Sequence, residues 1–306
     1  MEKQKKGFGV LSNRAKGIIC IIFAAMGFSA MSVFVRLSGD NLPSFQKAFF
    51  RNAVALVFIT VVMIKEKKLF LPKKQNIPFI FGRAFFGTIG LVSNFYAIDH
   101  LVLADANMLN KLSPFFAIVF SLFLLKEKPT FVQIIGVFCA MFGSVLIIKP
   151  GFANPQMLPS LVGLCGGMGA GLAYTFVRKL GSMGEDGSRI IFWFSLFSCV
   201  ICIPFIITDF RPMTTGQVLL LIGAGCSACV GQVGITKAYI YAPAKEISVY
   251  DYTQVIFAAL FGFFIFDQIP DLLSVAGYVL ICGAGIAMFL YNTKKDRKKR
   301  LLEAIK

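Results

Sequence analysis

The stretch that decides the fold occurs twice: MGFSAMSVFVR at 26–36 and MGAGLAYTFVR at 168–178. Met, Gly, Phe, Val and Arg recur at matching places with a constant offset (168 − 26 = 142). Further pairs follow at an offset one residue shorter: Gly82 and Gly223, Gly90 and Gly231, Phe116 and Phe257. An offset shared by separated segments indicates an internal repeat. Residues 17–148 and 159–291 are therefore predicted to be two copies of one unit.

The composition indicates a helical membrane protein. The chain has 306 residues, of which 57% are hydrophobic and 15% charged, and its mean hydropathy is +0.76. Such a chain has too little polar surface to cover a soluble domain. A helix needs about 20 apolar residues to cross ~30 Å of hydrocarbon. Ten continuous stretches of this kind are predicted to be spans: 17–36, 44–64, 77–98, 101–125, 130–148, 159–178, 189–208, 214–237, 243–266 and 271–291.

The distribution of basic residues predicts the orientation. Lys and Arg concentrate in the N-terminal segment 1–16, in the even-numbered loops and in the C-terminal tail 292–306. The odd-numbered loops hold only Arg36, Lys47, Lys149 and Arg211. The positive-inside rule then places both termini in the cytoplasm. Five spans per copy would force the two copies into opposite orientations. The basic N-terminus resembles a signal peptide, but span 17–36 belongs to the repeat, so we expect it to be retained.

The formal net charge of +16 is interpreted as a topology signal. The basic tail can also contact anionic lipid headgroups, at about 1 kcal/mol per residue near the surface. No stretch outside the spans is long enough for a folded nucleic-acid-binding domain, so no nucleic-acid partner is expected.

Cysteine and histidine do not form a site for metal or catalysis. The pairs Cys199/Cys202 and Cys226/Cys229 have metal-ligand spacing but lie inside apolar spans. Thiolates are unfavourable there, and His100 is the only histidine in the chain. We therefore expect no metal, no cofactor and no enzymatic activity.

Polar residues at membrane depth are the candidates for substrate binding. Span 101–125 carries Asn107 and Asn110, with Lys111 at the edge of the same face. The equivalent span 243–266 carries Ser248, Asp251 and Gln254, at the repeat offset (251 − 110 = 141). A charge near the midplane costs about 2.5–3.5 kcal/mol on insertion scales, so Lys111 and Asp251 should face a wet cavity or each other. A purely structural Lys111–Asp251 pair remains an alternative to a substrate site.

Other polar residues rank below these. Asn94 and Tyr96 in span 77–98 and Tyr174 in span 159–178 could line the same cavity. Arg51 and Arg83 are interpreted as side chains that extend toward lipid headgroups. Gly163, Gly167 and Gly171 repeat every four residues, which predicts a tight helix contact.

The region from span 101–125 to span 130–148 resembles the EamA-type drug/metabolite transporters. The residues that carry the resemblance are Asn110-Lys-Leu-Ser-Pro114, the apolar run to Leu125, Lys126-Glu127-Lys128-Pro129, Gln133, Gly136 and Gly143. The second copy matches more loosely, with Asp267-Gln268-Ile269-Pro270 at the Glu-containing turn. The resemblance implies secondary transport of small metabolites, including amino acids, across the inner membrane, usually by export or exchange.

These observations favour a carrier that works by alternating access. Lys111 would bind a carboxylate or phosphate, Asp251 an ammonium group or a coupling proton, and Asn107 and Asn110 would donate or accept neutral hydrogen bonds. A zwitterionic amino acid or similar metabolite suits one cation and one anion. A lipid flippase accessory or a non-transporting scaffold would need no charged midplane face, and a channel would need a continuous polar pore.

Overall fold

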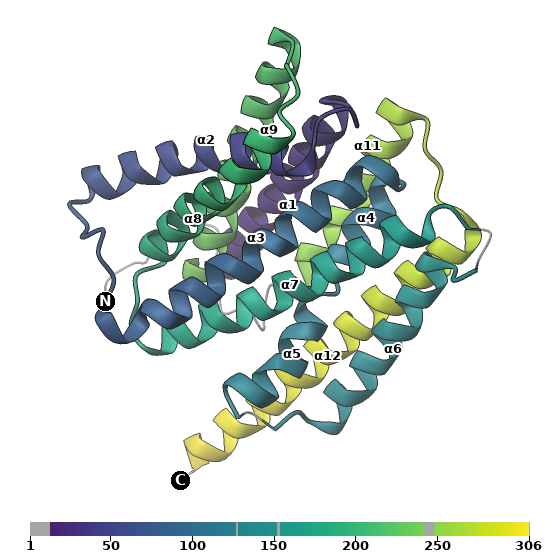
Figure 1. Ribbon diagram of the computed structural model, residues 1–306. Coiled ribbons are helices and arrows are strands. Elements are labelled where there is room, and N and C mark those ends of the chain that lie inside the picture. Colours follow the sequence, from purple (N-terminus) through teal and green to yellow (C-terminus); the bar gives the residue numbers. More distant parts are fainter. Residues whose placement is uncertain (1–12, 127, 152–153, 242–247, 306) are drawn as a thin grey trace, which may run out of the picture.

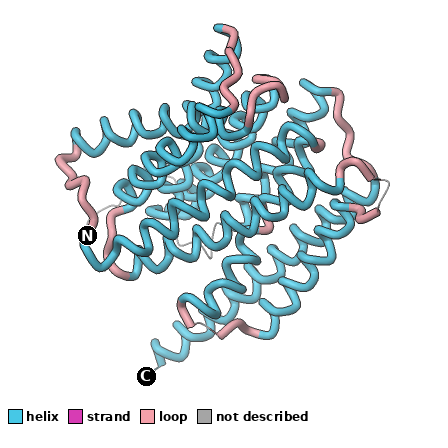
Figure 2. Tube along the Cα trace, viewed as in Figure 1, coloured by secondary structure: helices cyan, strands magenta, loops and turns pink. Residues whose placement is uncertain are grey.

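The described part of the chain contains ten helical segments that are long and apolar enough to cross a membrane. Figures 1 and 2 show the helices packed as a bundle. The computed structural model describes residues 13–126, 128–151, 154–241 and 248–305. Within those ranges every regular element is a helix. The first copy forms α1 (Asn13–Leu37), α2 (Ser44–Lys65), η1 (Lys74–Asn76), α3 (Ile77–His100), α4 (Leu103–Asn110), α5 (Ser113–Leu124) and α6 (Phe131–Ile148). The second forms α7 (Met157–Ser182), α8 (Gly187–Thr208), α9 (Thr215–Tyr241), η2 (Ser248–Tyr252), α11 (Thr253–Phe266) and α12 (Leu272–Ile305).

Local sequence explains where several helices begin. Thr130 and Gln133 form a capping box before α6, in which each side chain satisfies the other residue's backbone N–H. Thr214 and Gln217 make the same reciprocal contacts before α9. Because the first N–H groups of a helix have no partner inside it, these side chains fix the residue at which each span starts.

Span four is broken, which corrects the continuous helix expected over 101–125. Pro114 has no N–H to donate to the carbonyl of Asn110, and its ring clashes with that carbonyl. The backbone therefore turns at Lys111 and Leu112, where Leu112 N bonds to Leu109 O three residues back, and α5 restarts at Ser113. At the equivalent place in the second copy, the 3₁₀ turn η2 leads into α11.

Helices from different copies pack in pairs that obey the repeat. α1 lies along α9, and α3 lies along α7 (Figure 1). A Cβ on Gly27 would stand 3.0 Å from Gly231 N, and one on Gly169 would stand 3.0 Å from Gly90 N. Gly169 is the equivalent of Gly27, and Gly231 is the equivalent of Gly90. The α1–α9 contact and the α3–α7 contact, which we call the two glycine seams, are therefore copies of each other.

The predicted stripe on α7 also packs closely. A Cβ on Gly167 would stand 2.4 Å from Leu109 O, and one on Gly171 would stand 2.7 Å from Ser113 O. The stripe thus lets α7 approach the broken helix α4–α5, and the prediction of a tight contact is confirmed.

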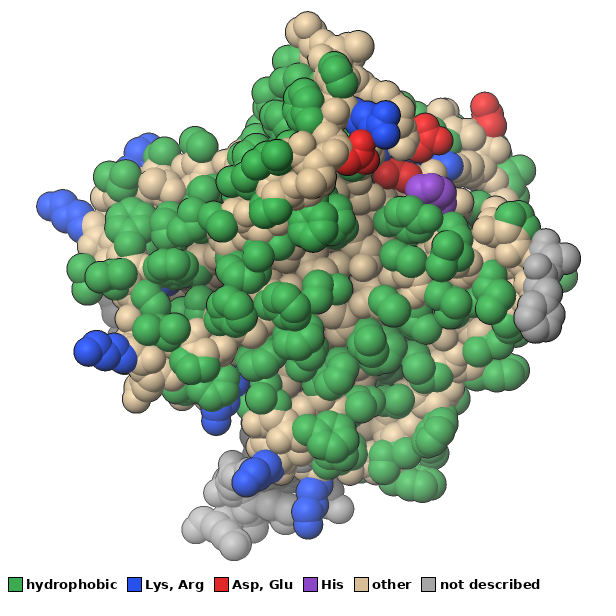
Figure 3. All heavy atoms as spheres, viewed as in Figure 1, with side chains coloured by type: hydrophobic (Ala, Val, Ile, Leu, Met, Phe, Trp, Pro, Cys, Tyr) green, Lys and Arg blue, Asp and Glu red, His purple; other side chains and the backbone are tan. Residues whose placement is uncertain are grey.

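Figure 3 shows the membrane-facing character of the surface. Hydrophobic side chains cover the middle of the visible face, and charged side chains gather toward its edges. Large apolar residues such as Phe123, Phe138 and Phe264 are 72–75% exposed. Exposed apolar area of this extent is unfavourable in water. The protein is a multi-pass membrane protein.

The two ends of the bundle hold different polar contacts. At the end that contains Arg36, Lys47 Nζ lies 2.6 Å from Asp99 Oδ1, and the two side chains are 0% and 3% exposed. Arg36 donates to the carbonyl of Ile98 at 2.8 Å and to that of Leu101. At the opposite end, Glu185 accepts from Asn76 at 2.6 Å and pairs with Arg189.

Candidate functional site

Lys111 and Asp251 form an ion pair in the interior. Lys111 Nζ lies 2.5 Å from Asp251 Oδ2, and the side chains are 10% and 21% exposed. Lys111 is the C-terminal cap of α4, at the break in span four, and Asp251 lies in η2. The break directs the lysine toward the other copy. In the described part of the chain, the second carboxylate oxygen of Asp251 is buried and has no hydrogen-bond partner. This oxygen is available to a proton or a donor group.

Asn107 and Gln254 extend the polar centre. Gln254 Nε2 donates to Asn107 Oδ1 at 2.8 Å, and Ser32 Oγ on α1 contacts the same oxygen at 3.3 Å. Asn107 Nδ2 donates to Leu103 O, and Ser29 Oγ donates to Gln254 O at 2.7 Å. Residues of α1, α4 and α11 thus meet in one network of hydrogen bonds. Sequence reasoning predicted Asn107 and Gln254 but not the two serines, which were indistinguishable from packing residues.

Asn94 and Asn110 lie toward α7. Asn94 is 7% exposed, and its Oδ1 has no hydrogen-bond partner within the described ranges. A Cβ on Gly166 would stand 3.1 Å from Asn94 N, so Asn94 sits in the α3–α7 seam. Asn110 is half-buried, and a Cβ on Gly167 would stand 3.7 Å from its Cα.

Tyr96 and Tyr174 do not join the ion pair in the structure. The Tyr96 ring stacks on His100 with ring centroids 4.2 Å apart, at the end of α3. Ser248 starts η2, and its side chain lies outside the described part of the structure. Tyr174 is 52% exposed and lines a cavity of about 330 Å³ instead.

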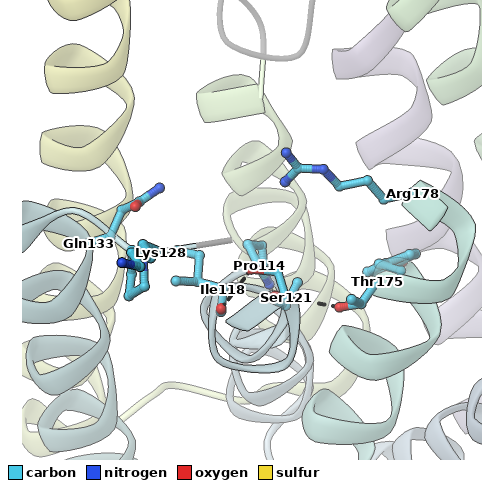
Figure 4. A pocket seen from close by; sticks show the side chains of 10 residues that line it. Pro114, Ile118, Ser121, Lys128, Gln133, Thr175 and Arg178 are labelled. Carbon is cyan, nitrogen blue, oxygen red and sulfur yellow. Dashed lines mark hydrogen bonds between the residues drawn. The ribbon is translucent and has the colours of Figure 1, made fainter. Parts of the chain in front are cut away.

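That cavity lies between α5, α6 and α7 (Figure 4). Gln133 on α6 and Thr175 and Arg178 on α7 border it, with Ser121 on α5 between them. Lys128 lines it as well. Polar groups from three helices therefore meet at a hollow near the end of the bundle that contains Arg178.

Sequence reasoning misplaced Arg51 and Arg83. Arg51 is only 4% exposed, and its guanidinium bonds to Asn52 Oδ1 at 2.7 Å. Arg83 lies over the ring of Phe194, 4.2 Å from its centroid. The interpretation as side chains that reach lipid headgroups is wrong, because both turn into the bundle. The available signal was that each cation sits inside an apolar span with no acidic residue nearby in sequence.

Comparison with known proteins supplies the family. The chain matches the EamA-like transporter family twice, over residues 15–149 and 157–291. The pseudopaline exporter of Pseudomonas aeruginosa is 32% identical over 287 residues, which cover 94% of this chain and 99% of the relative. An S-adenosylmethionine uptake transporter of Rickettsia bellii is 23% identical, covering 93% of this chain and 97% of the relative.

A protein of known crystal structure has a similar fold. It superposes with a TM-score of 0.62 at 16% identity, covering 91% of this chain and 98% of the other. At that identity the likeness concerns the fold alone. The two family matches, one on each repeat, agree with the doubled sequence, the paired glycine seams and the named transporters among the relatives. The chain belongs to the EamA-like transporter family.

Proposed function

We propose that the protein is a secondary carrier. It moves a small polar metabolite, an amino acid or a related zwitterion or anion, across the bacterial inner membrane by alternating access. The observation that carries the proposal is the Lys111–Asp251 ion pair at the breaks of the two repeat-related spans. Charges at this depth are unfavourable unless paired or wetted, and they mark substrate or proton pathways in membrane proteins. Carriers built from inverted repeats place their substrates where such broken helices meet.

The pair has the chemistry to exchange partners. A carboxylate or phosphate of the cargo would replace Asp251 at Lys111, and an ammonium group would replace Lys111 at Asp251. Asn107, Gln254 and Asn110 would supply neutral hydrogen bonds. The partnerless oxygen of Asp251 offers a place where cargo can bind before the pair opens. Opening without cargo would leave two unmatched buried charges, which is strongly unfavourable. Cargo and conformational change would thereby be coupled.

The relatives support a small-molecule cargo. One is named for the export of pseudopaline and another for the uptake of S-adenosylmethionine. Their opposite directions of transport leave both directions open to this fold. Their bacterial sources support the inner membrane as the location.

The test is counterflow in sealed proteoliposomes with a panel of labelled amino acids and S-adenosylmethionine. A carrier gives saturable counterflow with at least one of them, a channel gives linear flux, and a scaffold or flippase accessory gives none. Lys111→Gln and Asp251→Asn should each abolish counterflow while the protein still purifies as a folded monodisperse species. Lys149→Gln, which opens a partly exposed ion pair with Asp271, is the matched control and should retain flux.

A purely structural role gives a different pattern. Each single variant would then destabilise the protein, and the double variant Lys111→Gln/Asp251→Asn would recover both stability and transport. That recovery would contradict the proposal.

Proton coupling at Asp251 has its own readout. If Asp251 carries the coupled proton, Asp251→Glu retains accumulation driven by a pH gradient with a shifted pH profile. A wild-type rate of accumulation that does not change with pH over the range in which the protein stays folded would contradict proton coupling.

A further inference from the structure

Two arginines, the buried Arg51 and the half-buried Arg83, have no anionic partner among the described residues. Arg51 is 4% exposed, and its only hydrogen bond in the described structure goes to the neutral amide of Asn52. Arg83 makes its contact with the ring of Phe194. The Nε of each arginine is buried and without a hydrogen-bond partner among the described residues. Buried polar atoms are nearly always hydrogen-bonded, so two orphaned donors of like charge call for an explanation.

The two cations lie within electrostatic range of each other. Tyr174 is within that range of both. Among the described residues, none of the Asp or Glu side chains lies within ion-pair distance of either guanidinium. A buried cation without a counter-ion is unfavourable, and a second positive charge nearby adds to the cost. An anion bound by both arginines would reduce the repulsion and satisfy the unpaired N–H groups.

Tyr174 relates the arginines to the cavity. Cys199 on α8, Cys229 on α9 and Tyr174 on α7 lie within electrostatic range of Arg51 on α2. Tyr174 is within that range of Arg83 as well. It also lines the cavity of about 330 Å³ that Arg178 and Lys128 border. The same tyrosine therefore belongs to the surroundings of the arginines and to the lining of the cavity.

The fold itself does not require these arginines. The repeat equivalent of Arg83 is Ala224, and that of Arg51 is Phe192 or Trp193, according to where the one-residue gap falls. The second copy builds the same helices with uncharged residues at these positions. The arginines are therefore additions to one copy rather than part of the common framework.

We propose that Arg51 and Arg83 bind a carboxylate or phosphate group of the cargo, at a place on its path other than the Lys111–Asp251 pair. The inference rests on the proposed transport function and narrows its substrate class to molecules with an anionic group. A guanidinium presents parallel N–H donors that match the two oxygens of such a group, which lysine does not. A purely cationic amine is excluded as cargo.

The first experiment needs only the wild-type protein in detergent free of anionic lipid. Inorganic phosphate, citrate and glutamate are titrated against sodium chloride and choline chloride at matched ionic strength. Melting temperature is one readout. Emission of the single tryptophan, Trp193, is the other, because it adjoins Phe194 under Arg83. At least one of the three anions should give a saturable response that the chlorides lack. Equal responses to all five solutes would overturn the proposal.

Variants then locate the response. Arg51→Gln and Arg83→Gln should each weaken the apparent affinity by about tenfold or more, the loss expected for a charged hydrogen bond. Lys73→Gln removes an exposed cation next to α3 and should leave the affinity unchanged. Arg51→Lys and Arg83→Lys keep the charge and should bind more weakly than wild type. These lysine variants replace the glutamine variants in the test if the glutamine variants do not fold. Wild-type affinity in the folded arginine variants would overturn the assignment.

A second arm distinguishes cargo from lipid. Nanodiscs of phosphatidylcholine are compared with nanodiscs that contain phosphatidylglycerol. If only phosphatidylglycerol stabilises the protein, and the arginine variants lose that effect, the anion is a lipid headgroup and the cargo assignment fails. If the wild-type protein binds anions but shows no counterflow, the proposed carrier function is rejected and the anion-binding site stands. Counterflow that persists in the arginine variants without anion binding would reject the site alone.

Discussion

Arg36 and Arg178 hold the same position in the two copies of the repeat, yet their surroundings differ. Arg36 donates to the carbonyls that end α3 and lies 5.3 Å from the ring centroid of Phe266. Arg178 is exposed and lines the cavity between α5, α6 and α7. Because the residue is the same, the difference arises from the arrangement of helices around it. The Arg36 end of the bundle is closed around its arginine, and the Arg178 end is hollow beside its own.

The two copies are therefore packed against each other symmetrically, but the polar contacts at the two ends of the bundle differ. The two glycine seams have the same close approach, because a Cβ on Gly27 or on Gly169 would stand 3.0 Å from a backbone nitrogen of the other copy. The polar contacts at the two ends are not the same: Lys47 and Asp99 are fully enclosed, whereas Lys128 and Arg178 border a cavity. A carrier with this plan would exchange the two environments when it changes state.

The first test asks which end faces outside, and its outcome is all-or-none. Gly151→Cys lies beside Lys149 at the Arg36 end, and Lys295→Cys lies in the basic tail. With both termini in the cytoplasm, an impermeant maleimide should label the first variant in intact cells and the second only after permeabilisation. The reverse pattern would assign the hollow end to the outside.

The largest energetic effect is expected at the closed end. Lys47→Met should destabilise the protein by about 3–5 kcal/mol, because Asp99 would be left buried and unmatched. The double variant Lys47→Met/Asp99→Leu should recover most of the loss. Thermal unfolding in detergent measures both, with Arg211→Gln as control, since its pair with Asp209 is more than half exposed. If Lys47→Met melts at the wild-type temperature, the Lys47–Asp99 ion pair does not stabilise the Arg36 end of the bundle.

The glycine seams should respond alike. Gly27→Leu and Gly169→Leu each place a side chain against backbone atoms of the other copy and should each destabilise by about 1–3 kcal/mol. Leu161→Ala, at a position 39% exposed on α7, is the control with a smaller effect. Melting temperatures that fall for only one of the two glycines would break the equivalence of the seams.

The paired arginines should respond unequally. Arg36→Gln gives up charged hydrogen bonds to two carbonyls and should cost about 1.5–3 kcal/mol. Arg178→Gln changes an exposed side chain and should shift stability by about 0.5 kcal/mol or less. Chemical unfolding in mixed micelles compares them. Equal losses would mean that the two ends are closed to the same degree.

The smallest effect concerns pH at the Arg178 end. Burial works to raise the pKa of Glu185, but hydrogen bonds from Asn76 and Arg189 outweigh it and hold the pKa below its ordinary value of 4.5. A depressed folded-state pKa contributes stability that is present above the unfolded value and is lost as pH falls through the folded value. Glu185→Gln should therefore lower stability by about 1 kcal/mol or less at pH near 6 and flatten the acid limb below about pH 4.5. Melting curves across that range check the sign.

The fold could be predicted from hydropathy and from the internal repeat, because both can be read directly from the sequence. The span predicted at 77–98 is α3 at Ile77–His100, and the tight stripe at Gly167 follows from spacing alone. Depth along each span also predicted that Lys111 and Asp251 would face a cavity or each other, and they form an ion pair. The position of a residue along its span and the spacing between residues can both be read from the sequence, and folding into a helix does not change them.

The orientation and contacts of individual side chains could not be predicted, because they depend on how each helix is rotated and on residues distant in sequence. Arg51 could reach the headgroups by length, but the packing of α2 against α8 and α9 turns it inward. Tyr96 shares a helix with Asn94, but it stacks on His100 near the helix end. Pro114 marks the break in span four in the sequence. A hydropathy average over a whole span is barely changed by one proline, so the break was not predicted.

Each glycine seam joins a helix of one copy to a helix of the other. A half chain on its own would carry α1 and α3 with their glycine faces uncovered, and it could bury them only against an antiparallel second half. The seams are thus a subunit interface held within one polypeptide. A gene for a single unit would have encoded a protein that needed two opposite insertions in the membrane, and fusion of two such genes would have fixed the orientation of each half.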